Sequence, residues 1–168
     1  MCREMYRFFY QYLIFIIVFI VSGIILFIFM QHTFYDLEYS QDIILTPFKD
    51  LGYALSIIKN NFQNFLQYVF LFFISPILIL IELVILVYQL WLSVTYIGIS
   101  ETVGKLIKHA LVEIPTMTLY MFLSLKCCMR FYKNLSIKET IQFAIEYKVY
   151  YGFICIGIVV GGLIEGLL

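Results

Sequence analysis

The sequence predicts an all-α protein, a polytopic bundle of membrane-spanning helices, from its composition and from its long apolar runs. Of the 168 residues, 63% are hydrophobic and only 13% are charged, whereas soluble domains average about half apolar and a quarter charged. A soluble domain of this length still exposes about a third of its unfolded surface. So much apolar surface requires hydrocarbon as its solvent, and we expect a single integral membrane domain over residues 1–168 with about five transmembrane helices.

The first apolar run, residues 12–30, has no charge and is long enough to cross about 30 Å of hydrocarbon. No A-x-A cleavage site follows it, so we expect a permanent anchor. The run from Phe62 to Gly98 would be about 56 Å long as one helix, too long for one upright pass. Because Pro76 disfavours a helical Ser75, we place a tight hairpin within it. The predicted passes are 12–30, 60–77, 80–99, 110–127 and 149–168.

Two shorter amphipathic helices are expected at the membrane surface. One covers residues 47–59 and begins at Pro47, with Thr46 before it. The other covers 136–147, where Ser136 and Glu139 form the S-x-x-E pattern of a capping box. The basic residues of this second region are candidates for docking a cytoplasmic partner: Arg130, Lys133 and Lys138.

The distribution of lysine and arginine decides the orientation, because cytoplasmic loops carry an excess of them. Five passes with the amino end inside leave seven of these residues in the cytoplasm: Arg3, Arg7, Lys126, Arg130, Lys133, Lys138 and Lys148. Four lie outside: Lys49, Lys59, Lys105 and Lys108. A single pass over 62–98 would reverse that count. We therefore expect a cell-membrane protein with a cytoplasmic N-terminus and an extracytoplasmic C-terminus.

This topology places a cluster of polar residues in the outer half of the membrane: Asn60, Asn61, His109, Glu113 and Glu165. An acid at the centre of a membrane helix costs about 2.5–3.5 kcal/mol on insertion scales, so the cluster needs a reason. It either pins helices together or forms a proton or ion pathway. One His and two Glu on different helices are weak evidence for a metal, and we predict no metal and no cofactor. With four passes, Asn61 and Glu113 would lie in opposite leaflets.

Two features predict how the helices pack. Pro115 is expected to kink the fourth pass, with Thr116 and Thr118 available to satisfy the freed backbone groups. Two overlapping G-x-x-x-G pairs in the last pass predict a tight helix contact, either within the chain or with a partner. These pairs are Gly157 with Gly161 and Gly162 with Gly166.

Several classes of function have little support in the sequence. Eleven basic residues balance eleven acidic ones, which gives no indication of nucleic-acid binding. A paired nucleophile and base, an H-E-x-x-H motif and a P-loop are all absent from the sequence, so we do not expect an enzyme. The cysteines lack metal-binding spacing and are expected to be weakly polar helix residues, with palmitoylation of Cys2 or of Cys127 and Cys128 as the alternative. The abundance of Ile, Phe, Tyr, Asn and Lys is typical of an AT-rich bacterial genome.

The order of these features resembles the stage II sporulation protein M family. The residues that carry the resemblance are Asn60 and Asn61 before the second pass, Tyr88 and Gln89 in the third, His109, Glu113 and Pro115 in the fourth, and Ile164, Glu165 and Gly166 in the last. Many members have Asn-Gly in place of Gln89-Leu90 and His-Gly in place of His109-Ala110. The resemblance implies a membrane component of a complex that remodels septal peptidoglycan, or an export or immunity component encoded beside bacteriocin or ABC transporter genes.

The expected function is therefore a non-catalytic membrane subunit of a peptide or bacteriocin export or self-immunity system. Its expected partners are the lipid bilayer and other membrane subunits or an ABC-type ATPase, with homo-oligomers left open. The alternatives are a scaffold for sporulation or septal cell-wall remodelling, and a small ion- or proton-coupled transporter that uses Glu113 and Glu165.

Overall fold

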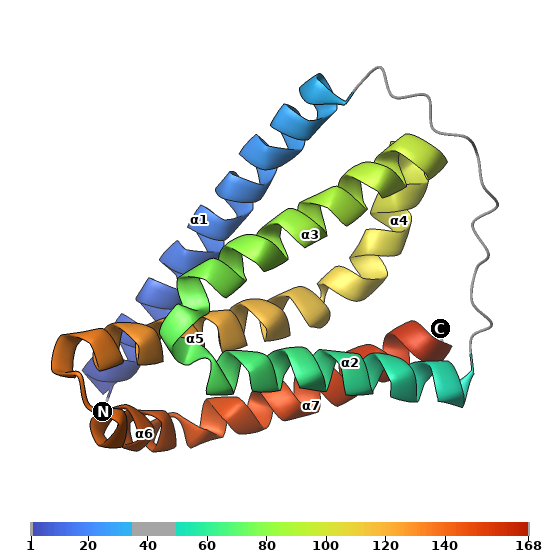
Figure 1. The fold of residues 1–168 in the computed structure, drawn as a ribbon. Coiled ribbons are helices and arrows are strands. Elements are labelled where there is room, and N and C mark those ends of the chain that lie inside the picture. Colours follow the sequence, from blue (N-terminus) through green and yellow to red (C-terminus); the bar gives the residue numbers. More distant parts are fainter. Residues whose placement is uncertain (1, 35–49, 168) are drawn as a thin grey trace. The chain divides into compact units, whose positions relative to one another are not determined.

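A computed structural model of the protein describes residues 2–34 and 50–167, and 94% of these residues are helical, with no strand among them. The all-α prediction is confirmed. The elements are α1 (Cys2–Thr33), α2 (Leu51–Phe70), the short 3₁₀ helix η1 (Phe72–Ile74), α3 (Ser75–Ile97), α4 (Ile99–Ala110), α5 (Glu113–Asn134), α6 (Ile137–Glu146) and α7 (Lys148–Leu167) (Figure 1). They form two compact units: α1 with residues 79–103, and the described residues of 45–78 with 104–167.

Within residues 2–34 and 50–167, three helical segments are long and apolar enough to cross a membrane: Tyr6–Thr33, Phe72–Ile97 and Lys148–Leu167. They account for the predicted passes at 12–30, 80–99 and 149–168. The passes predicted at 60–77 and 110–127 fall on α2 and α5, which are not among the three. Both helices have the length for a crossing, but polar and charged side chains interrupt their apolar sequence.

The join between α2 and α3 falls earlier than predicted. Pro76 lies in the first turn of α3 and not in a loop, and Ser75 before it has helical dihedrals (φ −53°, ψ −33°). Proline is tolerated in a first turn, because the N–H that it lacks has no partner there in any helix. The chain therefore turns at Leu71 and η1, several residues before the expected position.

Helix α2 combines a predicted surface helix and a predicted pass in one continuous element. Its N-cap is Asp50, whose carboxylate accepts a hydrogen bond of 2.7 Å from the backbone N–H of Tyr53. The predicted helix start at residue 47 lies outside the described residues. The helix has no break near residue 59. The polar residues in the middle of α2 therefore belong to one long helix.

Two further joins set the ends of the remaining helices. Gly98, with φ +82°, separates α3 from α4, and α4 covers the residues between the predicted passes at 80–99 and 110–127. Helix α5 runs past residue 127 to Asn134, and Leu135 adopts left-handed dihedrals after it. Helix α6 then begins at the predicted cap, where the Ser136 hydroxyl accepts a hydrogen bond of 3.3 Å from the Glu139 N–H.

The first unit packs α1 against α3. Leu83, Val87 and Trp91 are buried at i, i+4 and i+8, so they form one face of α3. A Cβ placed on Gly23 of α1 would lie 3.5 Å from Leu83 and 3.7 Å from Val87, and the Phe34 ring lies 5.8 Å from that of Trp91. Most of the apolar surface of α1 is exposed, as expected for a helix solvated by lipid.

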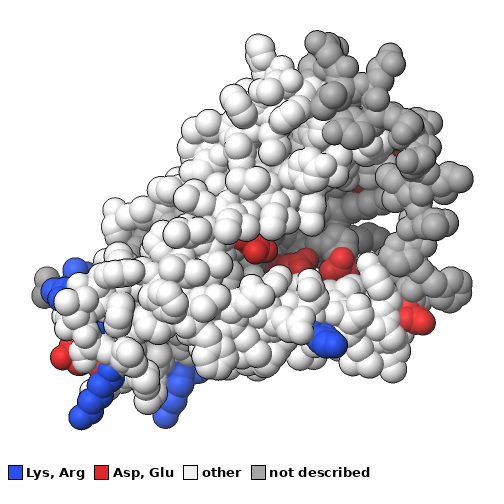
Figure 2. Space-filling model, viewed as in Figure 1, with Lys and Arg blue, Asp and Glu red and all other residues white. Residues whose placement is uncertain are grey.

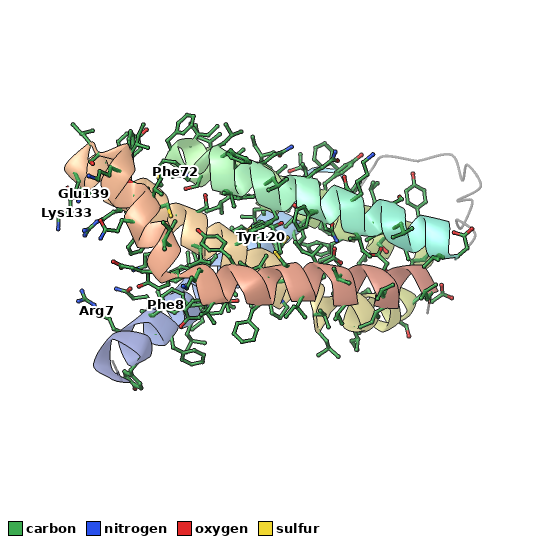
Figure 3. The ribbon with its side chains drawn as sticks, turned by 90° about the horizontal axis from the view of Figure 1, so that it is seen from below. Arg7, Phe8, Phe72, Tyr120, Lys133 and Glu139 are labelled. Carbon is green, nitrogen blue, oxygen red and sulfur yellow. The ribbon has the colours of Figure 1, made fainter. Side chains whose placement is uncertain are left out.

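The second unit is built around α5. Most of the residues in its central turns are buried: Met117, Thr118, Tyr120, Met121, Phe122, Leu123, Ser124, Cys127 and Cys128. Helices α2, α6 and α7 and the turn η1 pack around them. Figure 3 shows Tyr120 of α5 between α2 and α7, and its ring lies 5.0 Å from that of Tyr68. Helices α2 and α7 lie side by side along most of their length (Figures 1 and 3).

Candidate functional site

The polar site of the second unit centres on a hydrogen bond between α2 and α5. The Asn61 side-chain amide donates to Glu113 Oε1 at 2.9 Å, and both residues are half-buried. Hydrogen bonds to a charged group are stronger than those between neutral groups. The bond therefore fixes the beginning of α5 against the middle of α2.

Glu113 reaches Asn61 because α5 begins with it. The chain leaves α4 through Leu111 and Val112 and starts a new helix at Glu113, which places an acid in the first turn, where the helix dipole favours it. Pro115 also lies in this first turn. It was expected to kink a continuous pass, but it helps to start a helix and disrupts none of its hydrogen bonds. The Thr116 hydroxyl donates a 2.6 Å hydrogen bond back to the Val112 carbonyl, one turn earlier in the chain.

Two glycine pairs show how α7 packs in the same unit. Gly162 and Gly166 face α2, where added Cβ atoms would meet the backbone of Ile58 and Ala54. Gly157 and Gly161 face α5, where they would meet Thr116 and Val112. Gly162 and Gly166 therefore pack α7 on α2, and Gly157 packs it on α5, both within the same chain. Glu165, between these faces, is half-buried.

Not every residue of the predicted cluster joins this site. Asn60 is exposed and lies on a different face of α2 from Asn61, because neighbouring residues on a helix are about 100° apart. His109 lies in α4, and its side chain is outside the part of the structure that is described. The bond between Asn61 and Glu113 is therefore the part of the predicted cluster whose geometry is defined.

The core of this unit contains further polar contacts, one from Ser124, which the sequence did not single out, and one from Cys128. The Ser124 hydroxyl donates to the Tyr68 carbonyl at 2.7 Å, and the Cys128 thiol lies 3.6 Å from the Phe73 carbonyl. Both bonds connect α5 to the C-terminal part of α2 and the turn after it. Small polar residues on a helix that is otherwise apolar are the signal that could have found them.

A second feature missed from the sequence is a stripe of polar side chains on the outside of α2. Ser56, Asn60, Gln63 and Gln67 are all exposed. Their i, i+4, i+7 and i+11 spacing places them in one line along the helix. The opposite face of α2 is the buried one, with Ala54, Phe65 and Tyr68. We call these four residues the α2 polar stripe.

The far end of the second unit is basic. Arg130 and Lys133 in the last turns of α5 and Lys138 in α6 are exposed, and Figure 2 shows basic side chains gathered at this end of the molecule. Lys133 and Glu139 lie close to the point where α5 ends and α6 begins (Figure 3). The site of Asn61 and Glu113 and this basic end are therefore separated by most of the length of α5.

The described residues contain no group of three or more His, Cys, Asp or Glu side chains that could hold a metal ion. Comparison of the chain with protein-family models, with curated proteins and with solved structures finds no match. Function must therefore be argued from the geometry of the helices.

Proposed function

We propose that this protein is a non-catalytic integral membrane subunit that works with other polypeptides in peptide or bacteriocin export or in self-immunity. The observation that carries the proposal is the α2 polar stripe. Its four side chains face away from the helices that α2 packs against. A surface of this kind on a membrane helix is suited to a partner helix and unsuited to lipid.

The exposed side of α2 is divided into two stripes of different chemistry. Beside the polar stripe runs an apolar one, formed by Leu55, Phe62, Leu66 and Val69. The apolar stripe can face acyl chains. The amide side chains of the polar stripe gain about 0.6–2 kcal/mol each from hydrogen bonds to another membrane helix. The separation of the two stripes supports one lipid-facing and one protein-facing side.

The same proposal includes a five-pass topology in which α2 and α5 also cross the bilayer. At 1.5 Å per residue, α2 and α5 reach about 30 Å, enough for the hydrocarbon core. Because other helices cover α5 on most of its sides, its surface does not have to be as apolar as that of a lipid-exposed helix. The bond between Asn61 and Glu113 also supports five passes, since four passes would separate these residues by the bilayer.

An energy source has to come from a partner if the system performs transport. The 168-residue sequence has no P-loop, so an ABC-type ATPase or its membrane subunit is the partner we propose. The resemblance to the stage II sporulation protein M family, some of whose members are encoded beside such transporters, points to the same class. Other members of that family belong to complexes that remodel septal peptidoglycan, so a cell-wall remodelling complex is the alternative partner.

Site-specific photocrosslinking in the native membrane tests the proposal. A photoreactive phenylalanine analogue replaces Gln63 in the polar stripe or, as the matched control, Leu66 in the apolar stripe. We expect the Gln63 variant to give an adduct with another polypeptide, at least about fivefold more than the Leu66 variant. Mass spectrometry of the adduct identifies an ATPase complex or a septal protein. Equal yields from the two positions, or adducts confined to the same chain, would contradict a partner on this stripe.

A small ion- or proton-coupled transporter is a second candidate, and the hydrogen-bonded pair Asn61 and Glu113 favours it. An intramembrane acid with a polar partner is a common element of ion pathways. The test is ion and proton flux into liposomes that contain the purified chain, compared between the native protein and the variants Glu113→Gln and Glu165→Gln. A transporter requires a measurable flux that falls at least about tenfold in one variant. Unchanged flux in both excludes this function.

A further inference from the structure

We infer that α6 and the last turns of α5 form a binding surface for the headgroups of anionic phospholipids. The surface combines exposed basic side chains with an exposed apolar ridge, immediately before a helix that can span a membrane. The inference goes beyond the proposed function, because it requires the bilayer but no partner protein.

The charge of this region is the first observation. Residues 126–148 contain five basic and two acidic side chains. Arg130, Lys133, Lys138 and Lys148 are exposed, and so are the two acids, Glu139 and Glu146. Glu139 accepts a hydrogen bond from the Asn134 side chain. Clusters of Lys and Arg at a membrane surface attract anionic headgroups.

The apolar ridge is the second observation. Ile137, Ile141 and Ile145 are 60%, 54% and 58% exposed, and their i, i+4, i+8 spacing aligns them along α6. Another side of α6 packs against the rest of the second unit, since Thr140 is buried and α6 packs on α5. Lys138 borders the ridge, while Glu139 and Glu146 lie further round the helix. A helix with this distribution is suited to the boundary between headgroups and acyl chains.

The position of α6 in the chain is the third observation. It ends at Glu146, and α7, one of the three helices that can span a membrane, begins at Lys148. The single residue between them keeps α6 within a few ångströms of the end of that crossing. At this level an exposed isoleucine ridge meets acyl chains and the neighbouring lysines meet phosphates. The site is therefore matched to lipid more closely than to a cytoplasmic protein.

Fluorescence quenching by brominated lipids tests the inference with the full chain. The reporter is the tryptophan of the variant Ile141→Trp in a Trp91→Phe background, reconstituted in nanodiscs of phosphatidylcholine. One tenth of the lipid carries brominated acyl chains, as either phosphatidylglycerol or phosphatidylcholine. We expect brominated phosphatidylglycerol to quench this reporter more strongly, with an apparent affinity at least about tenfold higher.

Charge variants of the same reporter provide the decisive comparison. A triple variant combines Arg130→Gln, Lys133→Gln and Lys138→Gln. It should lose the preference for phosphatidylglycerol, but its reporter should still be quenched in discs of fully brominated phosphatidylcholine. Lys59→Gln on α2, also an exposed lysine, should leave the preference unchanged. Equal quenching by the two lipids, or a preference that survives the triple variant, overturns the inference. Absence of quenching by any brominated lipid overturns it as well.

Discussion

Gly166 allows α7 to lie directly against the backbone of α2. A Cβ at this position would overlap the Cα of Ala54 and lie 2.6 Å from its N atom. Backbone atoms cannot rotate away as the end of a side chain can, so the two helices would have to separate. Close approach of this kind is how small residues stabilise helix pairs in lipid, where the hydrophobic effect gives no driving force.

We therefore expect Gly166→Ala to destabilise the purified protein by about 1–3 kcal/mol, the usual cost of overpacking. The matched control is Gly152→Ala, on the same helix, where an added Cβ meets nothing within 4 Å. This second change should be neutral or stabilising by up to about 1 kcal/mol, because alanine favours the helix. Thermal unfolding in detergent measures both. A Gly166→Ala protein as stable as the Gly152→Ala protein would contradict the packing of α7 on α2.

Asn60 and Asn61 show how far single residues could be predicted. Both were placed in one polar cluster because they share a depth in the membrane. The depth of a residue in the membrane depends on its distance along the chain from the end of a pass. That distance predicted that Asn61 and Glu113 lie close together. The face of a helix on which a residue is buried depends on the neighbouring helices. The sequence also predicted two separate helices here, with the second beginning at residue 60. Once α2 is continuous from Leu51 to Phe70, Asn60 belongs to the α2 polar stripe, whereas Asn61 is half-buried and bonds to Glu113 of α5.

At the scale of elements, α6 was the most predictable helix because its start is encoded locally. Ser136 and Glu139 form the predicted cap within four residues of sequence. The α2–α3 join was harder to predict, since Pro76 is compatible both with a loop and with the first turn of a helix. Helix α5 was the hardest: its sequence is too polar for a lipid-exposed span, and only its burial by neighbouring helices makes a crossing reasonable.

The cap of α6 can be tested alone. Ser136→Ala removes the side-chain oxygen that accepts the Glu139 N–H, and N-cap losses of this kind cost about 1 kcal/mol. We expect faster amide hydrogen exchange at Glu139 and Thr140, by about fivefold, with α7 unchanged. Ser56→Ala on the exposed side of α2 serves as the control and should not alter exchange in α6. Unchanged protection after Ser136→Ala would mean that packing on α5, and not the cap, holds this helix.

At the scale of the whole molecule, the number of crossings determines which features face which side of the membrane. With the proposed cytoplasmic amino end, three crossings by α1, α3 and α7, or five with α2 and α5 added, both place the carboxyl end outside. They differ in the middle of the chain. Five crossings direct α3 outward and place α4 outside, whereas three crossings direct α3 inward and place α4 in the cytoplasm. Only five crossings leave the α2 polar stripe within the bilayer.

Ser100, exposed in α4, distinguishes the two topologies. In a protein whose native cysteines are replaced by alanine, we expect Ser100→Cys to react with a membrane-impermeant maleimide in intact cells. The matched variant Lys138→Cys, exposed in α6, should react only after the cells are permeabilised, since both topologies place α6 inside. Labelling yield on gels, compared before and after permeabilisation, measures the difference. A Ser100→Cys protein that is protected in intact cells and labelled after permeabilisation would reduce the crossings to three. It would also remove α2 from the membrane, and with it the physical reason for a partner on its polar stripe.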